Sequence, residues 1–120
     1  MASKCSEISI QSWNIHAIFS KINVFTYCKL QNPFFINHTA TKQIFCLVET
    51  QHTADDIEHL QILGFKCFQT CRKKLKFGRK HGGLAVYVRE YLTPGIEKVP
   101  TQGSETIVIK LKKRFLWTSI

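Results

Sequence analysis

The chain of 120 residues has no long apolar run. No segment approaches the roughly 18–20 apolar residues of a membrane-spanning helix, which argues against an integral membrane protein. Residues 1–7 lack the apolar stretch of a secretory signal, so we expect a nuclear or cytoplasmic protein that is not secreted, with reduced cysteines. No internal repeat or low-complexity segment is present, and the nine phenylalanines favour a folded core over disorder.

Acidic residues are also scarce. Eight Asp and Glu residues stand against seventeen Lys and Arg residues, which gives a formal net charge of +9. This excess favours an anionic partner, with nucleic acid first and an acidic membrane surface second. A basic protein without such a partner is the alternative.

The densest basic run covers residues 72–81 and contains no acid. Its cations are candidate contacts to nucleic-acid phosphates, and Phe77 could stack on a base. A solvated hairpin loop is an equally good interpretation. The candidate nucleic-acid-binding residues are Arg72, Lys73, Lys74, Lys76, Arg79 and Lys80.

The apolar pattern predicts strands and helices of one mixed α/β domain that spans residues 1–120. Residues 44–48 form a continuous apolar run, which is typical of a strand buried on both faces. Further strands are expected over 8–14, 65–70, 84–88 and 105–112. Helices are expected over 20–30 and 53–63, with Thr53 as an N-cap and Gly64 as the C-terminal stop, and residues 34–36 should continue the same covering layer. These helices should cover one face of the sheet.

Two of the expected strands end at polar side chains. Asn14 ends the first strand, and Glu49 directly follows the buried strand at 44–48. If the two strands are neighbours, Asn14 and Glu49 lie together at one edge, where open α/β sheets bind ligands. A carboxylate suits Mg²⁺, and a neutral amide can donate to phosphate without competing for the metal. Asn14 and Glu49 are therefore the candidate catalytic residues, and Glu49 is the candidate metal ligand.

Three blocks, at residues 10–15, 44–50 and 81–88, carry a family resemblance. In that order they resemble the N-terminal part of the endonuclease/exonuclease/phosphatase superfamily, most of all the endonuclease domains of non-LTR retrotransposons and apurinic-type nucleases. The resemblance implies a partial two-sheet α/β sandwich, with a mixed sheet and flanking helices, that cleaves phosphodiester bonds of DNA with Mg²⁺ or Mn²⁺. It also implies that Glu49 binds the metal and that Asn14 orients the phosphate or the metal's waters.

The chain departs from the family pattern in two places. His16 stands where many members have an acid, two residues after the asparagine. No aspartate follows Asp56, so the family's later Asp-x-Asn, second acidic and Asp-His motifs have no counterpart. We therefore expect a C-terminally truncated domain with weak or no catalysis, since general-base help alone contributes about 10²–10⁴-fold.

Other interpretations remain open. The chain could be a non-catalytic nucleic-acid-binding remnant that uses the basic run at 72–81. It could also fail to form a stable product, because half of a two-sheet sandwich leaves an apolar face and open strand edges. A zinc site at Cys67, Cys71 and His81 is disfavoured, since the spacing provides no second ligand pair.

Overall fold

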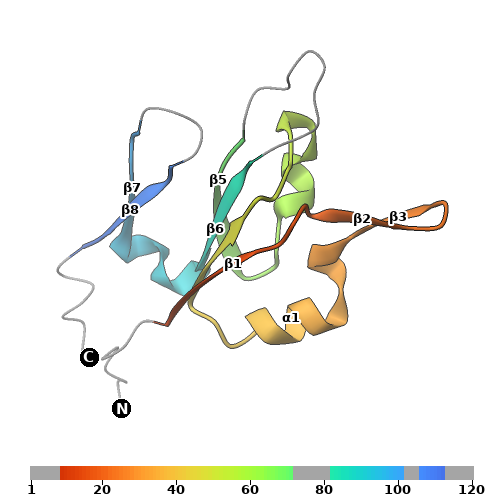
Figure 1. Ribbon diagram of the computed structural model, residues 1–120. Coiled ribbons are helices and arrows are strands. Elements are labelled where there is room, and N and C mark those ends of the chain that lie inside the picture. The colour runs from red at the N-terminus through yellow and green to blue at the C-terminus, as the bar shows by residue number, and fades with distance from the viewer. Residues whose placement is uncertain (1–8, 72–81, 102–105, 113–120) are drawn as a thin grey trace.

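The centre of the structure, a computed structural model, is a four-stranded mixed sheet. The structure describes residues 9–71, 82–101 and 106–112. The strands, in chain order, are β1 (Ile10–Asn14), β4 (Ile44–Val48), β5 (Phe65–Thr70) and β6 (Leu84–Arg89). In space they follow the order β1-β4-β6-β5 (Figure 1). These four strands and the helical segments beside them confirm the predicted mixed α/β class.

The register of the sheet decides which strand ends meet. β1 and β4 run parallel, with Asn14 opposite Val48. β6 runs antiparallel to both β4 and β5. The carboxyl ends of β1 and β4 therefore share one edge of the sheet with the amino end of β6.

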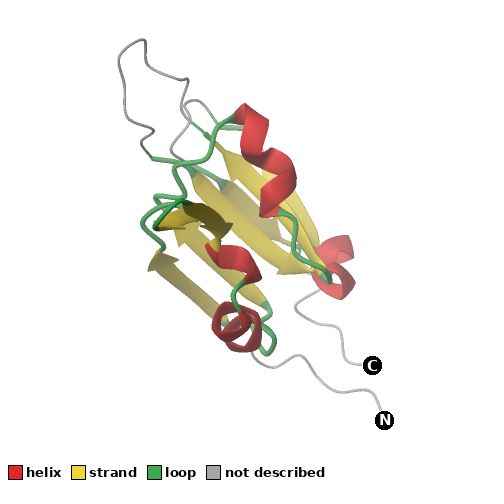
Figure 2. Ribbon diagram, turned by 90° about the vertical axis from the view of Figure 1, so that its right-hand side faces the viewer, coloured by secondary structure: helices red, strands yellow, loops and turns green. Residues whose placement is uncertain are grey.

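The first face of the sheet holds an aromatic core. Phe45 stacks on Trp13 and on Tyr87, with ring centroids 5.7 Å and 4.6 Å apart, and Phe65 meets Phe45 edge-on at 5.0 Å. Such ring pairs contribute about 0.5–1.5 kcal/mol each beyond the area they bury. Helical segments cover this face, as predicted (Figure 2). They are the 3₁₀ helix η1 (Lys29–Gln31), α1 (Pro33–Thr39) and the 3₁₀ helix η2 (Ala54–Leu60).

The second face has a smaller apolar core. Ile44, Val86 and Val88 pack there against Leu92 and Ile96. The covering elements are the 3₁₀ helix η3 (Glu90–Gly95) and a hairpin of β7 (Ile96–Val99) and β8 (Val108–Leu111). β8 confirms a strand within the predicted span 105–112. The cover is partial, because Ile10 of the edge strand β1 stays 60% exposed.

The segment from 20 to 30 is a β-hairpin, so the predicted helix is wrong. β2 (Phe19–Ile22) pairs antiparallel with β3 (Phe25–Cys28), and the hairpin projects from the body of the molecule (Figure 1). Asn23 in the connection has φ 56°, a left-handed conformation that asparagine tolerates better than most residues. The apolar residues here are mostly β-branched or aromatic, and such residues favour strands. Their helical spacing suggested one buried helix face, but most of these side chains are exposed.

The predicted helix over 53–63 is shorter and tighter than expected. Thr53 is the N-cap, and its backbone N–H donates to Asp56 Oδ2 at 2.9 Å. The segment is a 3₁₀ helix that ends at Leu60, so Gly64 is not its C-terminal stop. The predicted covering layer at 34–36 is confirmed as part of α1, whose first turn is capped by the Asn32 side chain.

Candidate functional site

Asn14 and Glu49 lie side by side at the end of the sheet where the carboxyl ends of β1 and β4 meet. Asn14 Nδ2 donates a hydrogen bond of 2.6 Å to Glu49 Oε2, and both residues are exposed. Parallel pairing puts the last residue of β1 opposite the last residue of β4, so Glu49 follows at the same rim. The structure therefore brings together the two residues that the sequence singled out as catalytic.

The backbone around the pair is held in an unusual conformation. Glu49 has φ 56° and His16 has φ 51°, both in the left-handed region. Two hydrogen bonds join the segments that follow the strands: Ala17 N donates to Glu49 O at 2.8 Å, and Ile18 N donates to Thr50 O at 2.9 Å. Within the first segment, His16 N donates to Asn14 Oδ1 at 2.8 Å. Left-handed non-glycine residues cost of order 1–3 kcal/mol and persist where the surroundings fix them. The segment after β1 thus clamps the segment that carries Glu49.

The glycine pair of the third sequence block lies against the same segment. Gln51 N donates to Gly82 O at 2.7 Å, and Thr50 N donates to Gly83 O at 3.2 Å. A Cβ on Gly83 would lie 2.3 Å from Thr50 Oγ1, so only glycine allows this close approach. The three blocks that carry the family resemblance therefore meet at one edge of the sheet.

A buried polar cluster lies directly behind Glu49, and the sequence pattern gave no sign of it. Thr50 and His52 are almost fully buried. The His52 ring bonds Thr50 Oγ1 through Nδ1 at 2.5 Å and Gln69 Oε1 through Nε2 at 2.7 Å. These partners satisfy both ring nitrogens, and the cluster ties the Glu49 segment to β5. Only the position of His52 three residues after Glu49 could have drawn attention to it.

Lys29 is a second residue that the sequence did not single out. Its Nζ donates to the carbonyls of Ile15 and His16, each at 2.9 Å. The ammonium group therefore stabilises the two carbonyl oxygens that follow Asn14 and places a positive charge close to the candidate site. Since Lys29 directly follows β3, this contact also ties the base of the projecting hairpin to the site.

The donor set at the rim suits a single hard cation that keeps most of its waters. Among the described residues, only Oε2 of Glu49 has polar partners, which are Asn14 Nδ2 and, at 3.7 Å, His16 Nδ1. No described residue bonds Oε1, and the side chain is 48% exposed, so this oxygen can face a ligand. Mg²⁺ commonly takes one or two carboxylates together with substrate phosphates and water. The residues present fit this mode of binding.

The cysteines in the described part of the chain gather into no cluster that could hold a competing metal ion. Burial raises the pKa of the Cys67 thiol to about 11, which keeps it protonated and makes it a poor zinc ligand. The four cysteines in the described part of the chain form no disulfide. His81, the third member of the disfavoured zinc set, lies outside the described residues. So do all six candidate nucleic-acid-binding cations of residues 72–81.

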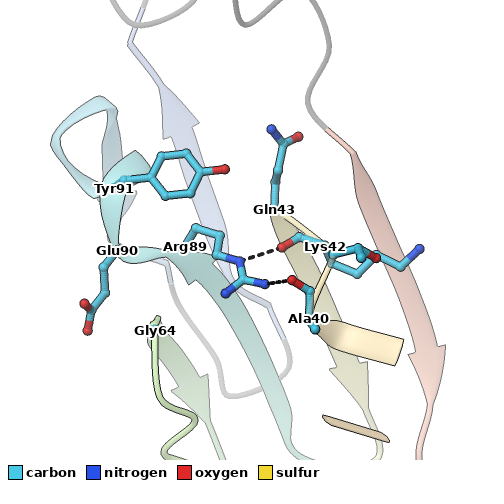
Figure 3. A pocket seen from close by; sticks show the side chains of 8 residues that line it. Ala40, Lys42, Gln43, Gly64, Arg89, Glu90 and Tyr91 are labelled. Atoms are coloured by element: carbon cyan, nitrogen blue, oxygen red, sulfur yellow. Dashed lines mark hydrogen bonds between the residues drawn. The ribbon is translucent and has the colours of Figure 1, made fainter. Parts of the chain in front are cut away.

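A pocket of about 540 Å³ opens at the opposite end of β4 from Glu49 (Figure 3). Arg89 forms part of its wall, but its guanidinium group already donates hydrogen bonds to three backbone carbonyls. They belong to Thr39, Ala40 and Lys42, at the end of α1 and just beyond it. The pocket is therefore built around a structural contact and is separate from the candidate site.

Comparison of the chain with protein-family models, with curated proteins and with solved structures gives no match. Within the described residues, no helix is both long enough and apolar enough to cross a membrane.

Proposed function

We propose that this chain is an endonuclease-like, divalent-metal-dependent phosphodiesterase domain of the retrotransposon type, with weak or no turnover on its own. The observation that carries the proposal is the 2.6 Å contact between Asn14 and Glu49 at the carboxyl edge of two parallel strands. The Gly82–Gly83 pair beside Thr50 and Gln51 adds the third element of the family pattern at the same place.

In the proposed site each residue has a separate role. Glu49 would hold Mg²⁺ or Mn²⁺ through Oε1, and the bound ion would polarise a phosphoryl oxygen and stabilise the leaving oxygen. Asn14 fixes the orientation of the Glu49 carboxylate, and its amide can turn a donor toward the scissile phosphate. His16, with its side chain 75% exposed, lies next to the carboxylate and can contact the same phosphate.

Low turnover is part of the proposal. In residues 9–71, 82–101 and 106–112, no three His, Cys, Asp or Glu side chains gather into a cluster. Glu49 therefore has no second carboxylate beside it there to complete a metal shell or to act as the general base. A missing base alone reduces the rate by about 10²–10⁴-fold.

The finer fold assignment, a two-sheet α/β sandwich, belongs to the same proposal. The β7–β8 hairpin lies over the second face of the central sheet and packs Ile107, Ile109 and Leu111 toward it. Asn14 and Ser12 share that face with Cys46 and Val48, according to the pairing of β1 with β4. A second layer that begins with this hairpin would leave the Asn14–Glu49 rim at the mouth between the layers.

Electron paramagnetic resonance of Mn²⁺ tests the cation site. We expect one bound Mn²⁺ in the wild type, at least ten-fold weaker binding in Glu49→Gln, and no change in the matched surface variant Glu58→Gln, whose side chain is 84% exposed. Equal binding by all three proteins would contradict the proposal. In a supercoiled-plasmid assay with Mg²⁺ we expect nicking at or near the metal-free background, and efficient Glu49-dependent nicking would overturn the low-turnover part.

A second candidate function is nucleic-acid binding without catalysis. It is favoured by the charge distribution, because residues 8–48 contain three lysines and no acid. This function predicts binding that weakens steeply with salt and is indifferent to sequence. Binding that does not change between low and physiological salt would reject it.

A further inference from the structure

The projecting β2–β3 hairpin presents a face with two largely exposed apolar side chains, Ile22 at 60% and Phe25 at 72% exposure. Cross-strand pairing sets Ile22 opposite Phe25 and Ser20 opposite Tyr27. Directly opposed residues of an antiparallel pair point to the same side, so these four side chains form one face. The other face, at its base, sends Phe19 and Cys28 into the core.

The two aromatic rings on this face are accessible to a ligand. Phe25 is 72% exposed and Tyr27 is 38% exposed, and both belong to the short strand β3. Residues two apart in a strand are separated by about 6.6 Å. The hairpin therefore offers two rings in a row on a two-stranded support, rather than a single exposed aromatic residue.

The base of the hairpin is joined directly to the candidate site. Lys29 N donates to Ile18 O at 2.7 Å, which closes the hairpin, while Lys29 Nζ holds the His16 carbonyl. Ala17, between His16 and the hairpin, donates to the Glu49 carbonyl. A chain molecule that places a phosphate at Asn14 and Glu49 would therefore have its neighbouring units close to the hairpin.

The charge of this region fits a polyanion. Lys21 lies on β2 and Lys29 directly follows β3, and no Asp or Glu occurs between residue 8 and residue 48. Lys21 is paired with Thr26 and belongs to the other face of the hairpin, so it adds positive charge near the rings without lying on their face. Aromatic rings on a segment that carries lysines and no acids are the usual composition of a single-strand nucleic-acid platform, where bases stack on rings and cations follow the backbone.

We propose that the β2–β3 hairpin binds single-stranded nucleic acid by stacking unpaired bases on Phe25 and Tyr27. This inference rests on the proposed function, because it assigns the hairpin the nucleotides next to the phosphate at Asn14 and Glu49. Bases that are paired and stacked within a duplex cannot lie flat on these rings. The hairpin therefore selects unpaired strands, at a nick, a gap or a frayed end.

Fluorescence anisotropy with a fluorescein-labelled 12-nucleotide single strand, in EDTA so that no metal contributes, tests the proposal. We expect the wild type to bind the single strand more tightly than a 12-base-pair duplex. Since loss of one stacking ring weakens binding by about five-fold or more, Phe25→Ala/Tyr27→Ala should weaken single-strand binding by at least about twenty-fold. The matched control is Phe34→Ala on α1, which removes an 85% exposed phenylalanine elsewhere and should change binding less than two-fold.

A second variant keeps the proposal falsifiable if the double variant folds poorly. Phe25→Trp should retain binding, and the single strand should quench its tryptophan emission. Unchanged binding in the double variant, equal losses in the double variant and in Phe34→Ala, or no quenching in Phe25→Trp would overturn the proposal. Binding to phosphatidylserine vesicles that needs Phe25 and Tyr27, without single-strand binding, would also overturn it.

The same assay separates this inference from the nuclease proposal. Because the comparison of the wild type with Phe25→Ala/Tyr27→Ala is made in EDTA, it does not depend on a cation at Glu49. If the double variant loses single-strand binding but Mn²⁺ fails to bind at Glu49, the hairpin inference stands and the phosphodiesterase proposal fails. If Mn²⁺ binds and the hairpin variant has no effect, the reverse holds.

Discussion

Gly83 and Thr50 approach each other so closely that any side chain on the glycine would collide with the threonine. A Cβ on Gly83 would lie 2.3 Å from Thr50 Oγ1 and 3.1 Å from His52 Nδ1. Because Thr50 directly follows Glu49, this contact joins the start of β6 to the segment that presents the candidate metal ligand. The close approach is what places the third sequence block beside the second.

Gly83→Ala should therefore destabilise the protein strongly. Gly83 has φ 88°, and the added methyl group would also displace Thr50 and its contact with His52. We expect a loss of about 2–4 kcal/mol in the free energy of unfolding, measured by urea denaturation. Gly64→Ala is the matched control, because Gly64 also has φ 88° but its Cβ would meet only Arg89 Nη1, at 3.4 Å. Equal losses in the two variants would show that backbone strain, and not the close approach, determines the effect.

Arg89 should stabilise the fold through its guanidinium rather than through its charge. Nε donates to the Lys42 carbonyl at 2.9 Å and Nη2 reaches the Ala40 carbonyl (Figure 3). Nη2 also reaches the Thr39 carbonyl, and the group lies 4.1 Å from the centre of the Phe65 ring. Lysine cannot make this planar set of contacts. We expect Arg89→Lys to lower the free energy of unfolding by about 1–3 kcal/mol.

The control for Arg89 is Lys66→Ala. Lys66 Nζ lies 5.3 Å from the centre of the Phe68 ring, and the residue is exposed. A contact of this kind contributes about 0.5–1 kcal/mol. If Arg89→Lys cost no more than Lys66→Ala, the proposed capping of α1 by the guanidinium would be wrong.

Stability should fall as the pH rises above about 9. Burial raises the pKa of Cys67 from 9.0 to about 11, and burial also raises the pKa of Tyr87 well above its ordinary value. Between the unfolded and folded pKa values the unfolded chain releases a proton that the folded chain keeps, so unfolding becomes more favourable with increasing pH. Cys67 alone should account for a loss of about 2–3 kcal/mol between pH 9 and pH 11.

Urea denaturation under reducing conditions at pH 8 and pH 10.5 measures this loss. Cys67→Ala should show a smaller decline than the wild type, while part of the decline remains because burial also raises the pKa values of Tyr87 and Cys46. Identical declines in the wild type and in Cys67→Ala would contradict the burial of a protonated thiol at this position.

The position of the candidate site could be predicted from the sequence, because it depends on local patterns. The continuous apolar run at 44–48 identified a strand buried on both faces; Asn14 ends the first strand, and Glu49 directly follows the buried one. Parallel neighbouring strands then bring their last residues to one rim, whatever the details of packing. The glycine pair was also recognisable, but its close approach to Thr50 was not, because that contact depends on tertiary register.

Tertiary contacts explain what the sequence pattern missed. The segment at 20–30 has apolar residues at mixed helical spacing, yet Val24 and Phe25 are among its most exposed side chains. Periodicity locates an apolar face only when that face is buried, and here it is not. His52 was missed for the opposite reason, because a polar residue in a loop gave no indication that Thr50 and Gln69 would enclose it.

Paramagnetic broadening by Mn²⁺ in an amide NMR spectrum tests the central claim most directly, because it shows where the cation binds. At substoichiometric Mn²⁺, the side-chain amide of Asn14 and the backbone amides of His16 and Thr50 should broaden first, and Glu49→Gln should abolish this selectivity. Their hydrogen bonds place them beside the carboxylate or directly after it. Broadening that begins elsewhere in the wild type, or that persists at Asn14 in Glu49→Gln, would contradict a cation site built by these two strand ends.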